Sequence, residues 1–305
     1  MPATPSVHTA AHLTPQRQRE VAEAADLARG HDGVAPLSEE TLLRLDSRPA
    51  EGEAPDPTWR HLLVDGPDGL AGYAHLDHSD PAAPWAELFV TPLSRHAGIG
   101  SALWQAVHEA APAVRVWAHG FLPVAAAFAR ARGLRVVREL WQMARPLTDE
   151  ITAPSRPLPP GFTITTFDPD DERDERDWLA VNAAAFVDHP EQGRIDRRAL
   201  RARMAEPWFD PAGFFLVRDP EGALAAFHWT KVEHGSGEVY VVGVHPERQG
   251  LGLGAVATAH GLQHLRDQGL TRVSLYVDGD NEAAIATYRR LGFERVGLDV
   301  QLAAG

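Results

Sequence analysis

The chain has 305 residues, a formal net charge of −13 and 44% hydrophobic residues. This length favours two domains, and the apolar content is sufficient for two cores. The acidic charge disfavours binding to nucleic acid or to anionic membranes, because like charges repel. The absence of cysteine excludes disulfides, thiolate metal sites and a cysteine nucleophile.

Targeting signals and metal motifs are not recognisable in the sequence. No apolar run approaches the roughly 18 residues that a membrane span needs. Residues 1–15 are polar and lack the basic start and apolar stretch of a signal peptide. We therefore expect a cytoplasmic protein, by default a monomer. The histidines show no spacing typical of metal ligands, so we expect no metal site.

The first half of the chain alternates helices and strands. Thr14 and Pro15 form a good N-cap and first helical position, so a helix is expected to begin there. A second helix is expected over residues 38–45, and two strands at 61–64 and 70–73 flank the turn residues of a hairpin. The next elements expected are a strand, a helix and a strand, at residues 86–90, from the following glycines to about 111, and 114–117.

A proline-rich stretch follows the first half, beginning at Pro146 and ending at Gly161. Proline lacks a backbone N–H and has a fixed φ, so such a stretch cannot enter a helix interior or a central strand. We therefore interpret residues 149–161 as a linker. It separates an N-terminal domain, residues 1–148, from a C-terminal domain, residues 162–305.

The second half repeats the order of the first. Val256, Ala259, Leu262 and Leu265 recur at helical spacing. The other elements expected, in chain order, lie at residues 162–167, 171–186, 197–204, 214–217, 224–230, 238–244, 272–277, 281–291 and 293–302. The sequence therefore predicts an α/β fold in each half, with a mixed sheet and flanking helices.

One segment occurs twice. Residues 90–100 resemble residues 244–254, and the valine, the proline and the last two glycines recur at a constant offset. A repeat of domain length indicates a duplicated domain and not a solenoid.

Each copy places a glycine loop, residues 95–100 or 249–254, between a strand and a helix. Glycines let backbone N–H groups converge on an anion, and the helix N-terminus adds the positive end of its dipole. A phosphate or pyrophosphate is the natural ligand. The loop is not a P-loop, because the Gly-Lys-Ser/Thr ending is missing, and no fitting acidic residue completes a dinucleotide fingerprint.

The spacing Gln/Arg-x-x-Gly-x-Gly after a strand resembles the pyrophosphate motif of the GNAT superfamily of N-acetyltransferases. Residues 281–293 resemble its Asn-x-x-Ala…Tyr…Gly-Phe signature. The resemblance implies two tandem GNAT domains with acetyl-CoA as co-substrate and no metal. The cofactor contacts it implies are Leu88, Phe89, Val90, Arg95, His96, Ala97, Gly98, Ile99 and Gly100 in the first half, and Val242, Gly243, Val244, Gln249, Gly250, Leu251, Gly252, Leu253, Gly254, Ala255, Asn281, Glu282, Ala283, Ala284, Ile285 and Ala286 in the second.

A narrower resemblance covers nearly the whole chain. Residues 32–36, 189–193, 227–231 and 237–244 resemble the mycothiol synthase family of tandem acetyltransferases. That family moves acetyl from acetyl-CoA to the cysteinyl amine of a cysteinyl-glucosaminyl-inositol. The resemblance implies a small-molecule amine as acceptor, with contacts from Glu39, Glu191, Lys231, Glu238 and Tyr276, and so a pocket at the domain junction.

The chemistry requires a base and an acid. An α-amine with a pKa near ~8 is mostly protonated at neutral pH and cannot attack a thioester. Glu238, on the strand before the glycine loop, is the expected general base, and Tyr288 is the expected acid for the CoA sulfur. Without a cysteine, direct transfer in a ternary complex is favoured. The first half has Pro84 and Ala129 at the matching positions, so we expect it to lack transferase activity.

Two alternatives remain open at this stage. One is an acetyltransferase for another amine, such as a polyamine, an aminoglycoside or a protein N-terminus. The other is a non-catalytic CoA-binding sensor built from a decayed duplicate. The presence of both Glu238 and Tyr288 argues against the sensor.

Overall fold

The computed structural model describes residues 5–45, 58–148, 157–187, 189, 192–233 and 235–305. The chain divides into two compact units. Unit 1 is Met1–Leu140 with Leu298–Gly305, and unit 2 is Trp141–Gly297. Strands β6 (Leu134–Pro146) and β12 (Glu294–Ala304) therefore each have residues in both units.

Unit 1 is built on strands that follow one another in space as in sequence. Its strands are β1 (His8–Ala10), β2 (Trp59–Gly66), β3 (Gly69–Asp77), β4 (Trp85–Val90) and β5 (Arg115–Ala118), followed by the end of β12. Neighbours from β1 to β4 are antiparallel, whereas β4 and β5 are parallel. Its helices are α1 (Pro15–Asp32), α2 (Glu39–Leu45), α3 (Ile99–Ala110) and α4 (Pro123–Ala131), with short 3₁₀ turns η1 (Pro92–Ser94) and η2 (His119–Phe121).

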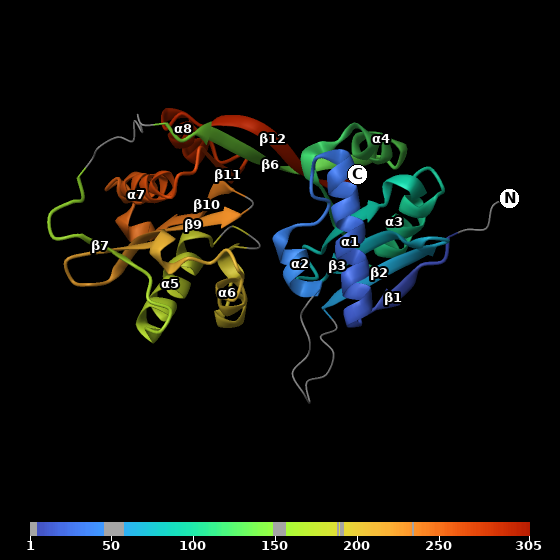
Figure 1. The fold of residues 1–305 in the computed structure, drawn as a ribbon, viewed down its shortest axis with the longest axis horizontal. Helices are drawn as coiled ribbons and strands as arrows, with labels where there is room; N and C mark the ends of the chain where they lie inside the picture. The colour runs from blue at the N-terminus through green and yellow to red at the C-terminus, as the bar shows by residue number, and fades with distance from the viewer. Residues whose placement is uncertain (1–4, 46–57, 149–156, 188, 190–191, 234) are drawn as a thin grey trace. The chain divides into compact units, whose positions relative to one another are not determined.

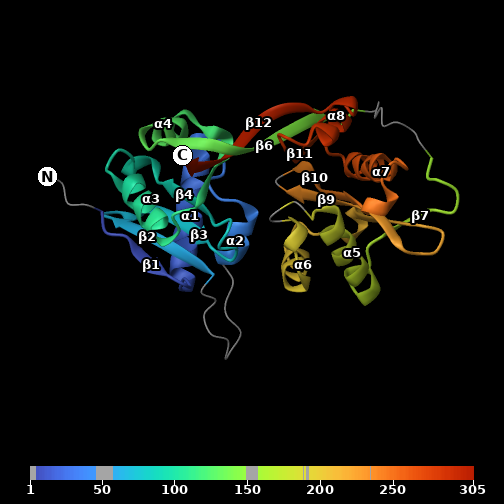
Figure 2. The same cartoon turned by 180° about the vertical axis from the view of Figure 1, so that it is seen from behind.

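Helices cover both faces of this sheet (Figures 1 and 2). Successive strand residues point to opposite faces, so Ala74 packs with Leu103 of α3, while Tyr73 packs with Val21 of α1. Helix α1 begins where the sequence predicts, because the Thr14 hydroxyl accepts a hydrogen bond from the Arg17 N–H.

Unit 2 repeats this arrangement. From β6 the strand order is β11 (Arg272–Asp278), β10 (Ser236–Val244), β9 (Leu224–Glu233), β8 (Phe214–Arg218) and β7 (Thr163–Thr166). The pair β10–β11 is parallel, and β7 to β10 are antiparallel. The helices are α5 (Glu172–Ala185), α6 (Arg197–Met204), α7 (Leu253–Asp267) and α8 (Glu282–Arg290), with 3₁₀ turns η3 (Gln192–Arg194), η4 (Pro211–Gly213) and η5 (Pro246–Arg248).

Two different sets of helices cover the faces of the unit 2 sheet. One face packs on α7, where Val239 lies with Leu262 and Leu265. The other packs on α5 and α6, where Trp229 lies with Trp178 and Leu200 (Figure 1). We call the second the α5/α6 face. It carries the side chains that matter for the site below.

The predicted mixed α/β fold is confirmed, and the predicted helices are present. Strand β1 was not expected, because three residues of mixed polarity carry no periodic signal. Within the described ranges, no helix is both long and apolar enough to span a bilayer.

Candidate active site

The sheet of unit 2 opens between β10 and β11. The parallel pairs are Gly237–Val273, Glu238–Ser274 and Val239–Leu275. Beyond Val239 the described part of β10 has no further pair with β11, although both strands continue. The segment that follows, residues 240–244, therefore borders an opening between two parallel strands.

A β-bulge accompanies this opening. The pairing of β10 with β9 shifts register between Val239 and Val241, so Tyr240 is the extra residue. The bulge places both Tyr240 and Val241 in the cluster on the α5/α6 face. A side chain at Gly243 would come within 2.6 Å of the Phe227 ring, so only glycine fits there.

The glycine loop of unit 2 leads directly from this strand into α7. Gly250 has φ 81° and Gly252 has φ 79°, a left-handed conformation that favours glycine. Gly252 is the N-cap of α7, and among the described residues no side chain caps that helix. The N-terminal N–H groups of α7, with the positive end of the helix dipole, thus remain available to an anion.

The glycine loop of unit 1 has the same backbone path. Gly98 is the uncapped left-handed N-cap of α3, and His96 has φ 62° where unit 2 has Gly250. Its arginine is engaged within the unit. The Arg95 guanidinium binds both carboxylate oxygens of Asp32, at 2.9 and 2.5 Å, and donates to the Val90 carbonyl.

Helix α8 carries the second expected cofactor segment. The Asn281 side chain accepts a hydrogen bond of 3.1 Å from the Ala284 N–H and so caps the helix. Ile285 is buried, whereas Glu282, Ala283 and Ala286 are exposed. Tyr288 is partly buried and packs edge-on against Phe293, with ring centroids 5.8 Å apart. Desolvation raises the pKa of its phenol to about 12, so the phenol is protonated at neutral pH.

Three expected residues share the α5/α6 face. Glu238 pairs in register with Lys231 on β9 and with Ser274 on β11. Register partners point to the same face, and so does Tyr276, two residues after Ser274. Tyr276 is 45% exposed, whereas Lys231 is buried. The structure therefore brings together the expected base and two expected acceptor contacts within unit 2.

Other expected residues are placed as follows. Phe89, Ile99 and Leu253 are buried in hydrophobic clusters, so only their backbone can reach a ligand. Glu39 is the first residue of α2 and is partly buried. Glu191 lies outside the described residues.

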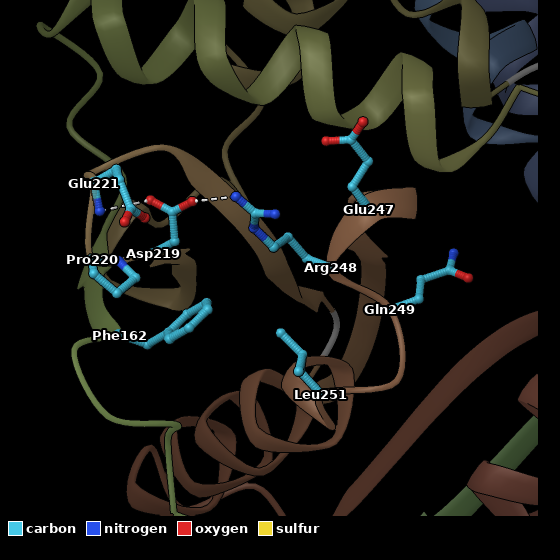
Figure 3. Close-up of a pocket in the computed structure, with 8 residues that line it drawn as sticks. All are labelled: Phe162, Asp219, Pro220, Glu221, Glu247, Arg248, Gln249 and Leu251. Atoms are coloured by element: carbon cyan, nitrogen blue, oxygen red, sulfur yellow. Dashed lines mark hydrogen bonds and ion pairs between the residues drawn. The ribbon is translucent and has the colours of Figure 1, made fainter.

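A shallow pocket adjoins the glycine loop on the side of the β8–β9 turn. Its volume is about 300 Å³, and it is lined by Phe162, Asp219, Pro220, Glu221, Glu247, Arg248, Gln249 and Leu251. Arg248 binds Asp219 at 2.9 Å, and the side chain of Gln249 points away from the pocket (Figure 3). Leu251 and Phe162 point toward each other across it. The pocket thus holds a neutralised ion pair and two apolar side chains.

Unit 1 contains a buried charge cluster that the sequence analysis did not find. His119 lies 2.9 Å from both Glu87 Oε1 and Asp299 Oδ2. Burial alone would lower the pKa of His119, but the two carboxylates outweigh it and raise the pKa to about 10. Glu87 also accepts from the Ser38 N–H, and Asp299 from the Gly120 N–H. The three residues come from distant segments, so no local motif marks them.

The strand opening and the uncapped glycine loop both lie within residues 174–293, which match the Acetyltransferase (GNAT) family. A GCN5-related N-acetyltransferase from Sphaerobacter thermophilus has a TM-score of 0.68 and 23% identity, covering 98% of this chain and 96% of its own. A tandem GNAT protein from the clavulanic acid biosynthesis pathway has a TM-score of 0.70 and 19% identity, covering 97% and 98%. GNAT enzymes use acetyl-CoA as acetyl donor.

Sequence relatives narrow the class. The mycothiol acetyltransferase of Thermomonospora curvata is 51% identical, covering 94% of each chain, and that of Salinispora arenicola is 52% identical, covering 90% of each. The chain belongs to the mycothiol acetyltransferase family.

Proposed function

We propose that this protein transfers the acetyl group of acetyl-CoA to the cysteinyl amine of a cysteinyl-glucosaminyl-inositol, which completes mycothiol. The observation that carries the proposal is the 51% identity, over 94% of both chains, to a mycothiol acetyltransferase. The unit 2 opening, with a carboxylate on one side and a protonated phenol on α8, supports the same reaction.

The pyrophosphate of acetyl-CoA binds the backbone N–H groups that begin α7, within the loop from Gln249 to Ala255. This part of the proposal is supported by the left-handed Gly250 and Gly252 and by the uncapped helix. The pantetheine arm enters the opening beside Val242, Gly243 and Val244. A backbone N–H of this segment polarises the acetyl carbonyl. Residues 281–286 border the same donor.

Glu238 accepts a proton from the acceptor's ammonium, directly or through water, which frees the amine to attack the thioester carbon. A C–N bond forms and the C–S bond breaks. Tyr288 donates its phenolic proton to the departing sulfur, and the phenolate regains a proton from the attacking nitrogen, so that CoA leaves as the thiol and the product is a neutral amide. The raised pKa of Tyr288, about 12, supports this role because the phenol carries its proton at neutral pH.

Residues 162–305 carry the chemistry, and residues 1–148 form a non-catalytic repeat. The first half has Pro84 opposite Glu238 and Ala129 opposite Tyr288. The loop of the first half also differs from that of the second, because Arg95 forms a bidentate pair with Asp32 where the second half has Gln249. Its contacts to acetyl-CoA, at residues 88–90 and 95–100, serve binding and not transfer.

The acceptor contacts are Glu39, Glu191, Lys231, Glu238 and Tyr276. An acceptor rich in hydroxyls suits carboxylate, ammonium and phenol partners. Lys231, Glu238 and Tyr276 share one face of the unit 2 sheet, which supports their grouping.

The proposal is tested by incubating the protein with acetyl-CoA and each acceptor in turn, and detecting products by mass spectrometry. The acceptors are the cysteinyl-glucosaminyl-inositol, a polyamine, an aminoglycoside and a peptide. We expect acetylation of the first at a kcat/KM at least ~100-fold above the others, because lost polar contacts leave buried groups unpaired. Preferred acetylation of another amine would contradict the acceptor assignment, and no acetylation of any would contradict the enzyme assignment.

A further inference from the structure

Lys231 is held in an unusual setting for a lysine. It is 8% exposed, although a lysine ammonium normally remains in water. Its Nζ lies 4.8 Å from the ring centroid of Trp208 and 5.8 Å from that of Tyr240. It also lies 3.1 Å from Glu233 Oε2. Two aromatic faces and a carboxylate therefore fix the position of this charge.

The two aromatic rings are themselves fixed. Trp208 and Tyr240 pack on each other, with centroids 4.9 Å apart, and both contact Trp229. The Tyr240 hydroxyl accepts a hydrogen bond of 2.9 Å from Arg203 Nε of α6. Tyr240 is also the bulged residue where β10 leaves its regular pairing. Lys231 therefore contacts a packed aromatic pair, one ring of which belongs to the bulged residue.

Lys231 lies directly opposite Glu238 on the neighbouring strand. Side chains of such antiparallel partners leave the same face, with Cβ atoms about 5 Å apart. The two charged side chains therefore leave neighbouring strands on one face, and a nearby positive charge favours the ionised form of a carboxylate. An ionised carboxylate is what a general base requires.

We propose that Trp208 and Tyr240 are positioning residues for acetyl transfer, which hold the Lys231 ammonium opposite Glu238 so that the base remains ionised. The inference rests on the proposed function of Glu238. Lys231 then has a second role besides acceptor binding. The aromatic pair has a role that the local sequence motifs do not indicate.

Other charged and titratable groups also lie on this face or beside it. Among the described residues they are Glu233 of β9, Tyr276 and Asp278 of β11, and Arg203 of α6, while His189 lies 3.6 Å from Asp278. Helix α5 adds the buried Glu175, which is paired with Arg197 and Arg201 of α6, beside apolar side chains such as Trp178 and Val181. Lys231 is the cation in register with Glu238, so its removal should dominate the change in protonation.

The test is the pH dependence of kcat/KM for the acceptor between pH 5 and 9, for wild type, Lys231→Met and Trp208→Leu. The acid limb should move to higher pH in both variants, by up to about one pH unit, because loss or displacement of a nearby opposite charge raises a carboxylate's pKa. The loss relative to wild type should be small at pH 8.5 and should grow as the pH falls through the acid limb, toward tenfold below it for a shift of one unit. The acceptor amine also titrates in this pH range, but it does so equally in every profile. The difference between a variant's profile and the wild-type profile therefore reports a change in the protonation of the enzyme.

Two further variants separate positioning from packing. Trp208→Phe keeps an aromatic face and should restore most of the wild-type limb. Phe209→Leu removes a ring that contacts Trp229 in the same cluster, and should leave the limb in place. If the acid limb moves as far in Phe209→Leu as in Trp208→Leu, the proposal is overturned. Circular dichroism monitors folding, and Tyr240→Leu, which removes the other ring near the Lys231 ammonium, replaces Trp208→Leu if that variant does not fold.

Glu238→Gln distinguishes failure of this inference from failure of the proposed function. If Glu238→Gln removes the activity but the acid limb of Lys231→Met stays at its wild-type position, the positioning role is wrong and the base assignment stands. If Glu238→Gln keeps full activity, the proposed base is wrong, and the inference falls with it.

Discussion

At the residue scale, the two side chains proposed for proton transfer occupy different environments. Glu238 is partly buried on a strand that faces α5 and α6, whereas Tyr288 packs among apolar residues on α8. This difference suits opposite tasks, because a base must be ionised and an acid must keep its proton.

Glu238→Gln removes the base and keeps the shape of the side chain. We expect kcat to fall by about 10²–10⁴, since general-base catalysis contributes this much. Steady-state kinetics with the cysteinyl-glucosaminyl-inositol acceptor checks this. The KM for acetyl-CoA should change little, and an unaltered kcat would show that another group takes the proton.

Tyr288→Phe removes only the hydroxyl. With the phenol's pKa raised to about 12, the wild-type kcat should show no alkaline loss from this group below pH about 10. The variant should lose at least about tenfold in kcat at every pH in that range. A pH-dependent loss that begins near neutrality would argue that the phenol is not the acid.

Functional residues that lie in a local motif could be predicted from the sequence. Residues that come together only in space could not. Glu238 and Tyr288 fall within short segments whose spacing carries the signal. Trp208 and the His119 cluster gain their roles only from distant strands and helices. The periodicity of a sequence carries no information about contacts between distant segments.

At the element scale, the glycine loops are the feature that both units share. Each begins a helix from a left-handed glycine, and this conformation is what a phosphate cradle needs. The loops could be predicted from the sequence because the glycine pattern directly follows a segment that reads as a strand. The bulge at Tyr240 was not, because an extra residue in a strand leaves the alternation ambiguous.

Gly252→Ala and Gly98→Ala form a matched pair. Each forces alanine into a left-handed conformation, at φ 79° and 82° respectively, which costs about 1–2 kcal/mol. Gly252→Ala should raise the KM for acetyl-CoA about tenfold. Gly98→Ala should lower thermal stability by about as much as Gly252→Ala does. Its effect on turnover should be much smaller. Equal kinetic losses would show that unit 1 contributes to catalysis.

The N-cap of α8 can be removed alone. Asn281→Ala should lower the free energy of unfolding by about 1 kcal/mol, and Asn281→Asp should retain most of it, because both Asn and Asp accept from the helix N–H groups. Urea unfolding followed by circular dichroism measures this. If the two variants lose equal stability, the capping hydrogen bond is not what Asn281 contributes.

At the scale of the whole molecule, β6 and β12 each have residues in both compact units. A repeat in the sequence predicts two similar folds. It does not predict which residues each fold uses, because the final strands carry no signal for their partner. Asp299 of β12 thus joins Glu87 and His119 in unit 1.

The His119 cluster should stabilise unit 1 in a pH-dependent way. The pKa of His119 is raised to about 10, so its contribution is fully present below about pH 6.5 and is lost as the pH rises through 10. His119→Gln should cost about 3 kcal/mol near pH 6, because it leaves the buried Glu87 and the partly buried Asp299 without their cation. The difference from wild type, measured by urea unfolding, should shrink toward pH 10. A difference that is constant with pH would contradict an ionised cluster.

The most direct measurement is a crystal structure of the protein with acetyl-CoA bound. The proposed mechanism requires the pyrophosphate on the N–H groups that begin α7, and the thioester in the unit 2 opening between Glu238 and Tyr288. An empty opening in unit 2, or a thioester turned away from both side chains, would contradict it.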